Sequence, residues 1–165
     1  MDKKINLLFV DDEEQFLQSL GKLLEARDFH VIAVNRGEKA IAAARKSPID
    51  VALVDLKMPG INGEETLRAL KEAHEWMEIV ILTGHGSLDS AVECTRSGAC
   101  AYLQKPCRID DLLMVLKDAY KKKVMNKNRI EEKKMNEMLL LSQSDSPRAI
   151  LRRLKEIDKG GATAD

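Results

Sequence analysis

The chain has 165 residues, which is enough for one domain with a substantial core and an appendage. It carries 27 Lys and Arg residues and 27 Asp and Glu residues, so its overall charge does not favour a nucleic acid or a membrane surface as a partner. No apolar stretch approaches the ~20 residues that span a bilayer, and the first residues leave no room for a signal peptide. We therefore expect a cytoplasmic protein that does not bind nucleic acid or membrane directly.

Five short apolar segments are typical of buried parallel strands, and they alternate with helical patterns. The segments cover residues 5–10, 29–34, 51–54, 79–82 and 100–103. Each is nearly continuous in apolar residues, as expected for strands that are covered on both faces. The alternation predicts an α/β domain of the flavodoxin-like type, with a five-stranded parallel sheet in the order 2-1-3-4-5 that is flanked by five helices.

Polar residues suited to phosphate chemistry stand at the ends of four of these strands. Asp11 and Asp12 follow the first strand, Asp55 follows the third, Thr83 follows the fourth and Lys105 follows the fifth. In open α/β sheets the ligand site lies outside the carboxyl ends of the strands, where the strand order reverses. We therefore expect these residues to converge on one site, with the three carboxylates clustered between the first and third strands.

The chemistry of this residue set favours a hard metal ion and a phosphoryl group. Three crowded carboxylates make an anionic pocket that is costly unless a cation neutralises it. Because only oxygen ligands are present at these strand ends, the expected cation is Mg²⁺. An aspartate beside such an ion can attack phosphorus. The Lys105 ammonium and the Thr83 hydroxyl could then hold the phosphoryl oxygens.

Residues 5 to about 120 resemble the receiver domain of bacterial two-component response regulators. The resemblance is carried by Val10-Asp11-Asp12, Asp55-Leu56-Lys57-Met58-Pro59-Gly60, Thr83-Gly84-His85-Gly86 and Lys105-Pro106. The stretch after Thr83 looks most like the receivers of nitrogen-regulation transcription factors. One departure is Cys107, because relatives often carry an aromatic residue directly after the Lys-Pro pair.

The resemblance implies a role for each residue of the site. Asp55 would accept a phosphoryl group from a sensor histidine kinase. Mg²⁺ would be held by Asp12, Asp55 and the backbone carbonyl of Lys57, with Asp11 acting largely through water. Thr83 and Lys105 would contact the phosphoryl group, and the Lys105–Pro106 peptide would be cis.

The resemblance also implies a switch. Thr83 would move toward the phosphate and Tyr102 would rotate inward, which would remodel the face made by the fourth helix, the fifth strand and the fifth helix. The output would be a change in association with a downstream protein or a second copy. Catalysis would be limited to self-phosphotransfer and autodephosphorylation, so the protein would not be an enzyme.

Three alternatives remain open from the sequence. The chain could be the receiver part of a longer transcription regulator, or a scaffold with this fold that is not phosphorylated. It could also be a phosphatase that acts on small substrates, although no second general acid or binding cap is evident. Direct measurement of Mg²⁺ binding would separate the scaffold from the switch.

The composition changes after Tyr120, so we assign residues 1–122 to the receiver domain and 123–165 to a helical extension with a disordered tail. Lys121, Lys122 and Lys123 fit a solvated helix face. The extension could pair two chains through its helix, link to another domain or fold back on the receiver. We favour a helical extension that supports formation of a homodimer, and the fourth helix–fifth strand–fifth helix face is the other candidate dimer surface.

Overall fold

The structure is a computed structural model, and it describes residues 3–56, 58, 60–61, 63–84, 86–144 and 147–160. The chain divides into two compact units, Met1–Lys123 and Val124–Asp165, and each unit is described by itself. In the described part, no helix is both long and apolar enough to cross a membrane.

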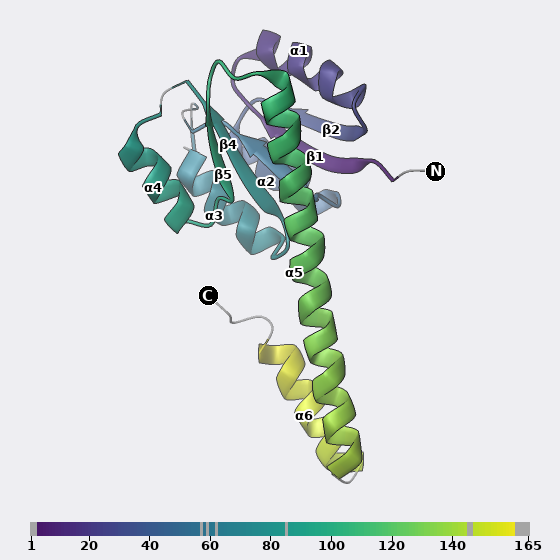
Figure 1. Ribbon diagram of the computed structural model, residues 1–165. Helices are drawn as coiled ribbons and strands as arrows, with labels where there is room; N and C mark the ends of the chain where they lie inside the picture. The colour runs from purple at the N-terminus through teal and green to yellow at the C-terminus, as the bar shows by residue number, and fades with distance from the viewer. Residues whose placement is uncertain are drawn as a thin grey trace. The chain divides into compact units, whose positions relative to one another are not determined.

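The first unit is built on a five-stranded sheet in which all neighbouring strands are parallel (Figure 1). The strands are β1 (Ile5–Val10), β2 (Phe29–Val34), β3 (Val51–Val54), β4 (Glu78–Thr83) and β5 (Ala101–Gln104). Their order is β2-β1-β3-β4-β5, which confirms the predicted flavodoxin-like fold. Since Val10 of β1 pairs with Val54 of β3, the residues that follow these strands leave the sheet at the same level.

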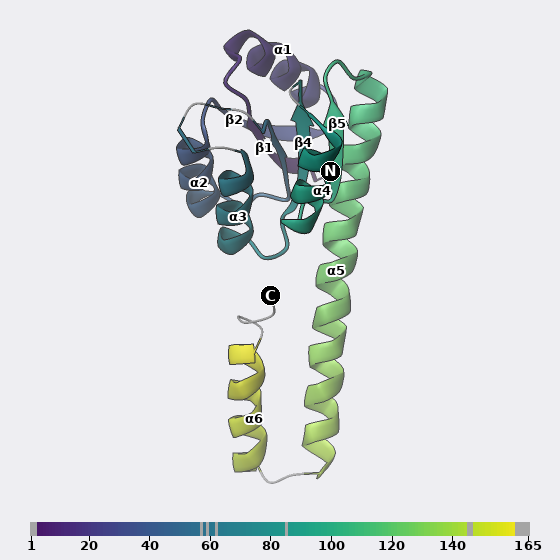
Figure 2. The ribbon, with the colours of Figure 1, turned by 90° about the vertical axis from the view of Figure 1, so that its left-hand side faces the viewer.

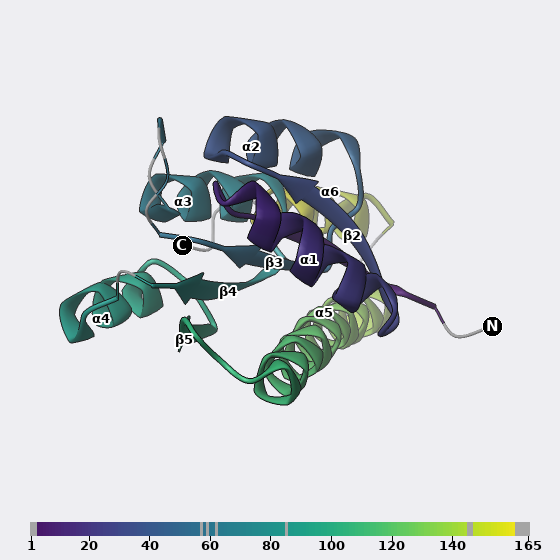
Figure 3. The same ribbon diagram turned by 90° about the horizontal axis from the view of Figure 1, so that it is seen from above.

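Helices cover both faces of this sheet (Figure 3). The described residues form six helices: α1 (Glu14–Glu25), α2 (Gly37–Lys46), α3 (Gly63–Ala73), α4 (Leu88–Arg96), α5 (Ile109–Ser144) and α6 (Pro147–Gly160). Buried side chains of α1 and of the start of α5 pack on one face, while those of α2, α3 and α4 pack on the other. Ser87 caps α4, because its hydroxyl oxygen accepts a hydrogen bond from the Ser90 N–H at 3.1 Å.

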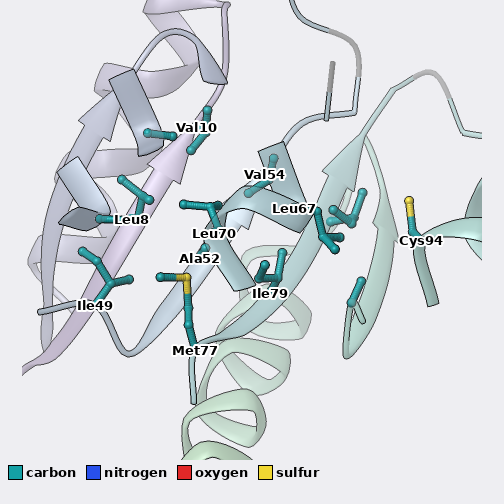
Figure 4. Close-up of a cluster of buried hydrophobic side chains, with 14 of the residues drawn as sticks. Leu8, Val10, Ile49, Ala52, Val54, Leu67, Leu70, Met77, Ile79 and Cys94 are labelled. Atoms are coloured by element: carbon teal, nitrogen blue, oxygen red, sulfur yellow. The ribbon is translucent and has the colours of Figure 1, made fainter. Parts of the chain in front are cut away.

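The core follows from the two-residue repeat of side chains along buried strands. Leu8 and Val10 of β1 point into the cluster beneath α2 and α3, whereas Leu7 and Phe9 point into the cluster beneath α1 and α5. Figure 4 shows the first cluster, in which side chains of the sheet meet Leu67 and Leu70 of α3. This packing on both faces makes the sheet a rigid platform for the loops at its carboxyl end.

The second unit contains the end of α5 and the whole of α6, and the two helices run antiparallel as a hairpin (Figure 2). Leu140 and Leu141 of α5 line one hollow together with Ile157 of α6, so α6 lies against this part of α5. The predicted C-terminal helical extension is thus confirmed, and α5 continues to Ser144. The predicted disordered tail, 161–165, lies outside the described residues, and the predicted boundary at residue 122 stays a prediction.

Candidate functional site

The carboxyl ends of β1 and β3 bring three aspartates together. One carboxylate oxygen from each of Asp11, Asp12 and Asp55 lies within 4.8 Å of the others. Asp11 is 1% exposed and Asp55 is 4% exposed, whereas Asp12 is exposed to solvent. The backbone fixes this arrangement, because the Asp55 N–H donates to the Val10 carbonyl at 3.0 Å and so continues the pairing of the two strands.

Lys105 and Thr83 come to the same place from the ends of β5 and β4. The Lys105 ammonium lies 2.6 Å from Asp11 Oδ2 and 3.8 Å from Asp55 Oδ2. The Lys105 N–H donates to the Thr83 carbonyl at 2.9 Å, which ties the two strand ends together, and the Lys105–Pro106 peptide is cis. Thr83 is fully buried. The structure therefore brings all five strand-end residues to one edge of the sheet.

The charges of this cluster do not balance. Partial burial alone would lower the pKa of Lys105, but its hydrogen bond to Asp11 and the negative charges of Asp11, Asp55 and Glu13 raise it overall. Lys105 is thus held as a cation, and its ammonium also lies 4.3 Å from the centre of the Phe16 ring. Among the described residues, one ammonium faces three aspartates and the Glu13 carboxylate, which is 3.8 Å from it, so these residues carry excess negative charge.

This excess of oxygen ligands fits a hard divalent cation. Carboxylates and water are the ligands that Mg²⁺ prefers, and one or two carboxylates with a phosphate oxygen usually hold it. Asp12 and Asp55 could ligate the ion directly, while Asp11 already uses Oδ2 for Lys105 and Oδ1 to accept the Glu13 N–H at 2.9 Å. The predicted carbonyl ligand, Lys57, lies outside the described residues.

Gly63, which the sequence reading did not single out, fixes the backbone behind the site. Its N–H donates to the Leu56 carbonyl at 2.8 Å, at the first residue of α3. A Cβ at this position would lie 2.5 Å from the Leu56 Cα and 2.7 Å from the Asp55 carbonyl oxygen, both backbone atoms that cannot move aside. Only glycine therefore allows α3 to begin directly against the residue that follows β3.

Tyr102 lies on β5, paired with Ile81 of β4 and packed against the core cluster beneath α3. Its hydroxyl is buried and has no hydrogen-bond partner among the described residues. Burial raises the pKa of this hydroxyl. A Cβ at Gly86 would overlap the hydroxyl, so the ring lies directly beneath the loop that follows β4. Tyr102 is thus close to the segment that begins at Thr83.

An apolar groove borders the site on the side of α1. It has a volume of about 640 Å³ and lies between α1, the loop after β5 and the start of α5. Its lining includes Phe16, Leu20, Leu23, Pro106 and Ile109, together with Lys105 and Glu13. Neither the groove nor the role of Glu13 was predicted from the sequence. The groove depends on α1 lying beside the start of α5, and Glu13 acts because it lies beside Lys105 in the loop after β5.

Comparison with known proteins agrees with this geometry. The family model described as the response regulator receiver domain matches residues 7–117. A curated relative, the transcriptional regulatory protein ZraR of Klebsiella oxytoca, is 29% identical over 161 residues. The match covers 98% of this chain and 36% of ZraR, so the chain spans about a third of that relative.

Solved structures give the same result. A CheY-like response regulator receiver domain protein from Methanospirillum hungatei superposes with a TM-score of 0.72 at 28% identity, over 74% of this chain and 98% of that one. The beryllofluoride-activated NtrC4 receiver domain dimer, solved in solution, gives a TM-score of 0.68 at 30% identity, over 72% of this chain and 98% of that one. These likenesses cover about three quarters of this chain rather than the whole of it.

Proposed function

The chain belongs to the receiver domain family of two-component response regulators, and on this premise we propose that it is a signalling switch phosphorylated on Asp55. The observation that carries the proposal is the convergence of one ammonium and three carboxylates at the ends of parallel strands. Asp55 is the buried carboxylate that follows the central strand β3, and Lys105 lies 3.8 Å from it.

The phosphoryl donor is a phosphohistidine of a sensor histidine kinase. An Asp55 carboxylate oxygen attacks phosphorus, the P–N bond breaks, and its electron pair stays on the imidazole nitrogen, which takes up a proton from water. Bound Mg²⁺ supplies positive charge that offsets the charge of the three phosphoryl oxygens. Lys105 pairs with one of these oxygens, and the Thr83 hydroxyl donates to another.

Water later attacks the acyl phosphate and restores Asp55. The chain then turns over no external substrate, and its chemistry is limited to phosphorylation and dephosphorylation of itself. The kinase approaches along the groove of Phe16, Leu20 and Pro106, because this groove ends at Lys105 and leads to Asp55. An apolar groove of this kind fits the apolar stripe of a helix that carries the phosphohistidine.

Phosphorylation is read out at the face of α4, β5 and α5. Thr83 moves toward the phosphoryl group, and Tyr102 beneath the neighbouring loop follows it. Large apolar side chains are exposed on α4 and α5, including Leu88 at 81% and Met114 at 58%. The NtrC4 receiver domain is described as a beryllofluoride-activated dimer, which supports a second copy as one partner of this face. The C-terminal helical hairpin is an alternative dimer surface.

A downstream protein is the other partner we propose, and control of transcription is its output. This candidate rests on relatives such as ZraR, which is named a transcriptional regulatory protein. A pull-down with phosphorylated and unphosphorylated chain would identify proteins that bind only one state. The same experiment in the presence of excess free chain separates a downstream protein from a second copy.

The experiment that tests the proposal is labelling by acetyl phosphate in the presence of Mg²⁺. We expect one phosphoryl group per chain, observed by intact mass spectrometry, and none in Asp55→Asn. Asp118→Asn is the matched control, because Asp118 is an exposed aspartate on α5 and labelling should persist. Labelling that survives Asp55→Asn would rule out Asp55 as the acceptor. An absence of Mg²⁺ binding by calorimetry would replace the switch with a scaffold that is not phosphorylated.

A further inference from the structure

A second group of charges lies at the amino ends of the strands, opposite the phosphorylation site. Asp50 precedes β3 and is 7% exposed, and Glu78 begins β4 and is 6% exposed. Asp50 Oδ2 accepts the Asn6 N–H at 2.9 Å, and the Asp50 N–H donates to the Asn6 carbonyl at 2.9 Å. Asp50 thus links the starts of β1 and β3 with both its backbone and its side chain.

The cations that partner these acids come from α5. The Lys123 ammonium pairs with Asp50 Oδ1, and the Lys123 side chain is only 18% exposed. The Lys122 ammonium lies 3.9 Å from Glu78 Oε2, and this side chain is 56% exposed. We call these four residues, Asp50, Glu78, Lys122 and Lys123, the latch. The latch consists of two ion pairs, which we call its arms. The Asp50–Lys123 arm is close and largely buried, and the Glu78–Lys122 arm is longer and is screened by water.

The latch also contacts β5, the strand that carries Tyr102. Cys100 directly precedes this strand, and its N–H donates to the Ile79 carbonyl at 2.9 Å. Burial of the Cys100 thiol and the negative charge of Glu78 raise its pKa to about 11. Because Cys100 is hydrogen-bonded to the residue that follows Glu78, a shift of β5 at Tyr102 acts two residues away on the backbone next to Glu78.

We propose that the latch is a conformational device that holds the segment of α5 ending at Lys123 against the sheet until phosphorylation opens it. The weaker Glu78–Lys122 arm opens first, when β5 moves. Only the Asp50–Lys123 arm then still holds α5 against the sheet. Withdrawal of Lys123 leaves the Asp50 charge largely buried without its cation, and this cost keeps the latch closed in the unphosphorylated chain. The inference rests on the proposed function for its trigger, but not for the latch itself.

Amide hydrogen exchange of the full chain, with and without acetyl phosphate and Mg²⁺, tests the device. In the wild type we expect phosphorylation to speed exchange at residues 116–123 of α5 by about tenfold or more. In Asp50→Asn and Lys123→Met, exchange should already be this fast without phosphate. Asp50→Asn keeps a side-chain oxygen for the Asn6 N–H, so the sheet is retained. Lys121→Met is the control, because Lys121 is an exposed neighbour with no ion pair in the described residues.

The outcomes separate the latch from the proposed function. Slow exchange in unphosphorylated Asp50→Asn, equal to that of the wild type, would overturn the latch. Equal exchange in labelled and unlabelled wild type would overturn its opening by phosphorylation. Slow exchange in unphosphorylated Lys123→Arg, which keeps the positive charge, would support the ion pair as the cause. If the wild type is not labelled at Asp55, the proposed function fails while the comparison of unphosphorylated variants still decides whether the latch exists.

Discussion

The two ends of the sheet carry charged clusters of opposite design. At the carboxyl end, Asp11, Asp12 and Asp55 converge on one ammonium of the described residues, that of Lys105. At the amino end, two carboxylates meet two ammonium groups in the latch. The first cluster therefore has a surplus of negative charge, and the second is balanced within the chain.

This difference separates a site built for a ligand from one built for structure. A surplus of negative charge costs stability in the absence of a ligand, and a bound cation recovers that cost. A balanced cluster has nothing to gain from a ligand, and it stabilises the fold as it stands. Changes at the two ends should therefore affect stability with opposite signs, and this expectation can be measured.

The largest effect should come from loss of the central acid of the latch. Asp50→Ala removes the partner of Lys123 and the acceptor of the Asn6 N–H together. We expect a loss of about 2–3 kcal/mol in the free energy of unfolding, because a hydrogen bond and a largely buried charge lose their partners. Urea unfolding followed by circular dichroism measures it.

The control for this change is Asp12→Ala at the other end of the sheet. Asp12 is exposed and stands among like charges, so its removal should cost no stability and relieve repulsion in the metal-free chain. A similar loss in both variants would show that the two clusters do not differ in kind. Asp50→Asn should fall between the wild type and Asp50→Ala, since it keeps the acceptor and loses only the charge.

The next effect is stabilisation by Mg²⁺. At a concentration ten times the dissociation constant, Mg²⁺ should raise the free energy of unfolding of the wild type by about 1.4 kcal/mol. Asp12→Ala should lose most of this increase, because Asp12 is the exposed carboxylate that faces solvent from the cluster. Thermal unfolding across a Mg²⁺ titration provides the measurement.

The latch supplies the control for this titration as well. Asp50→Asn, at the opposite end of the sheet, should respond to Mg²⁺ as strongly as the wild type does. An equal loss of response in both variants would mean that Mg²⁺ acts through overall stability rather than through the aspartate cluster. An unchanged response in Asp12→Ala would remove Asp12 from the metal site.

The same comparison shows what the sequence can predict. Asp11, Asp55, Thr83 and Lys105 each end an apolar run, and parallel strands bring their carboxyl ends to one edge, so the pattern placed them together. The family match, the strand order and the C-terminal helices agree with the prediction. The roles assigned to individual site residues stay predictions until labelling and Mg²⁺ binding are measured.

The latch could not be found in the same way. Lys123 was interpreted as part of a solvated helix face, and this was wrong, because its side chain is 18% exposed and pairs with Asp50. These two residues are 73 positions apart, and no local pattern links a helix position to the start of a strand. The one available signal was Asp50, which stands directly before the apolar run that begins at Val51. A charged side chain at the buried start of a strand needs a partner.

The smallest effect is the titration of Cys100, whose thiol pKa depends on the charges of Glu78 and Lys122 at the amino end of the sheet. Burial and the charge of Glu78 raise the pKa of this thiol to about 11, whereas Lys122 and Lys71 lower it. The folded chain therefore holds the thiol proton more tightly than the unfolded chain, and the resulting stability is lost as the pH rises from about 9 to about 11. Because the thiol is partly exposed, we expect this loss to be under about 1 kcal/mol.

The rate of alkylation by iodoacetamide against pH measures the thiolate directly, in a chain that carries Cys94→Ala and Cys107→Ser. Adding Lys122→Met should raise the pKa further, and Glu78→Gln should lower it, because these charges act on the thiol with opposite signs. Lys121→Met should leave the profile unchanged. If Glu78→Gln and Lys122→Met both leave the pKa of Cys100 unchanged, the Glu78–Lys122 ion pair does not interact with β5. The amino end then only holds α5 in place, and phosphorylation cannot open the latch through β5.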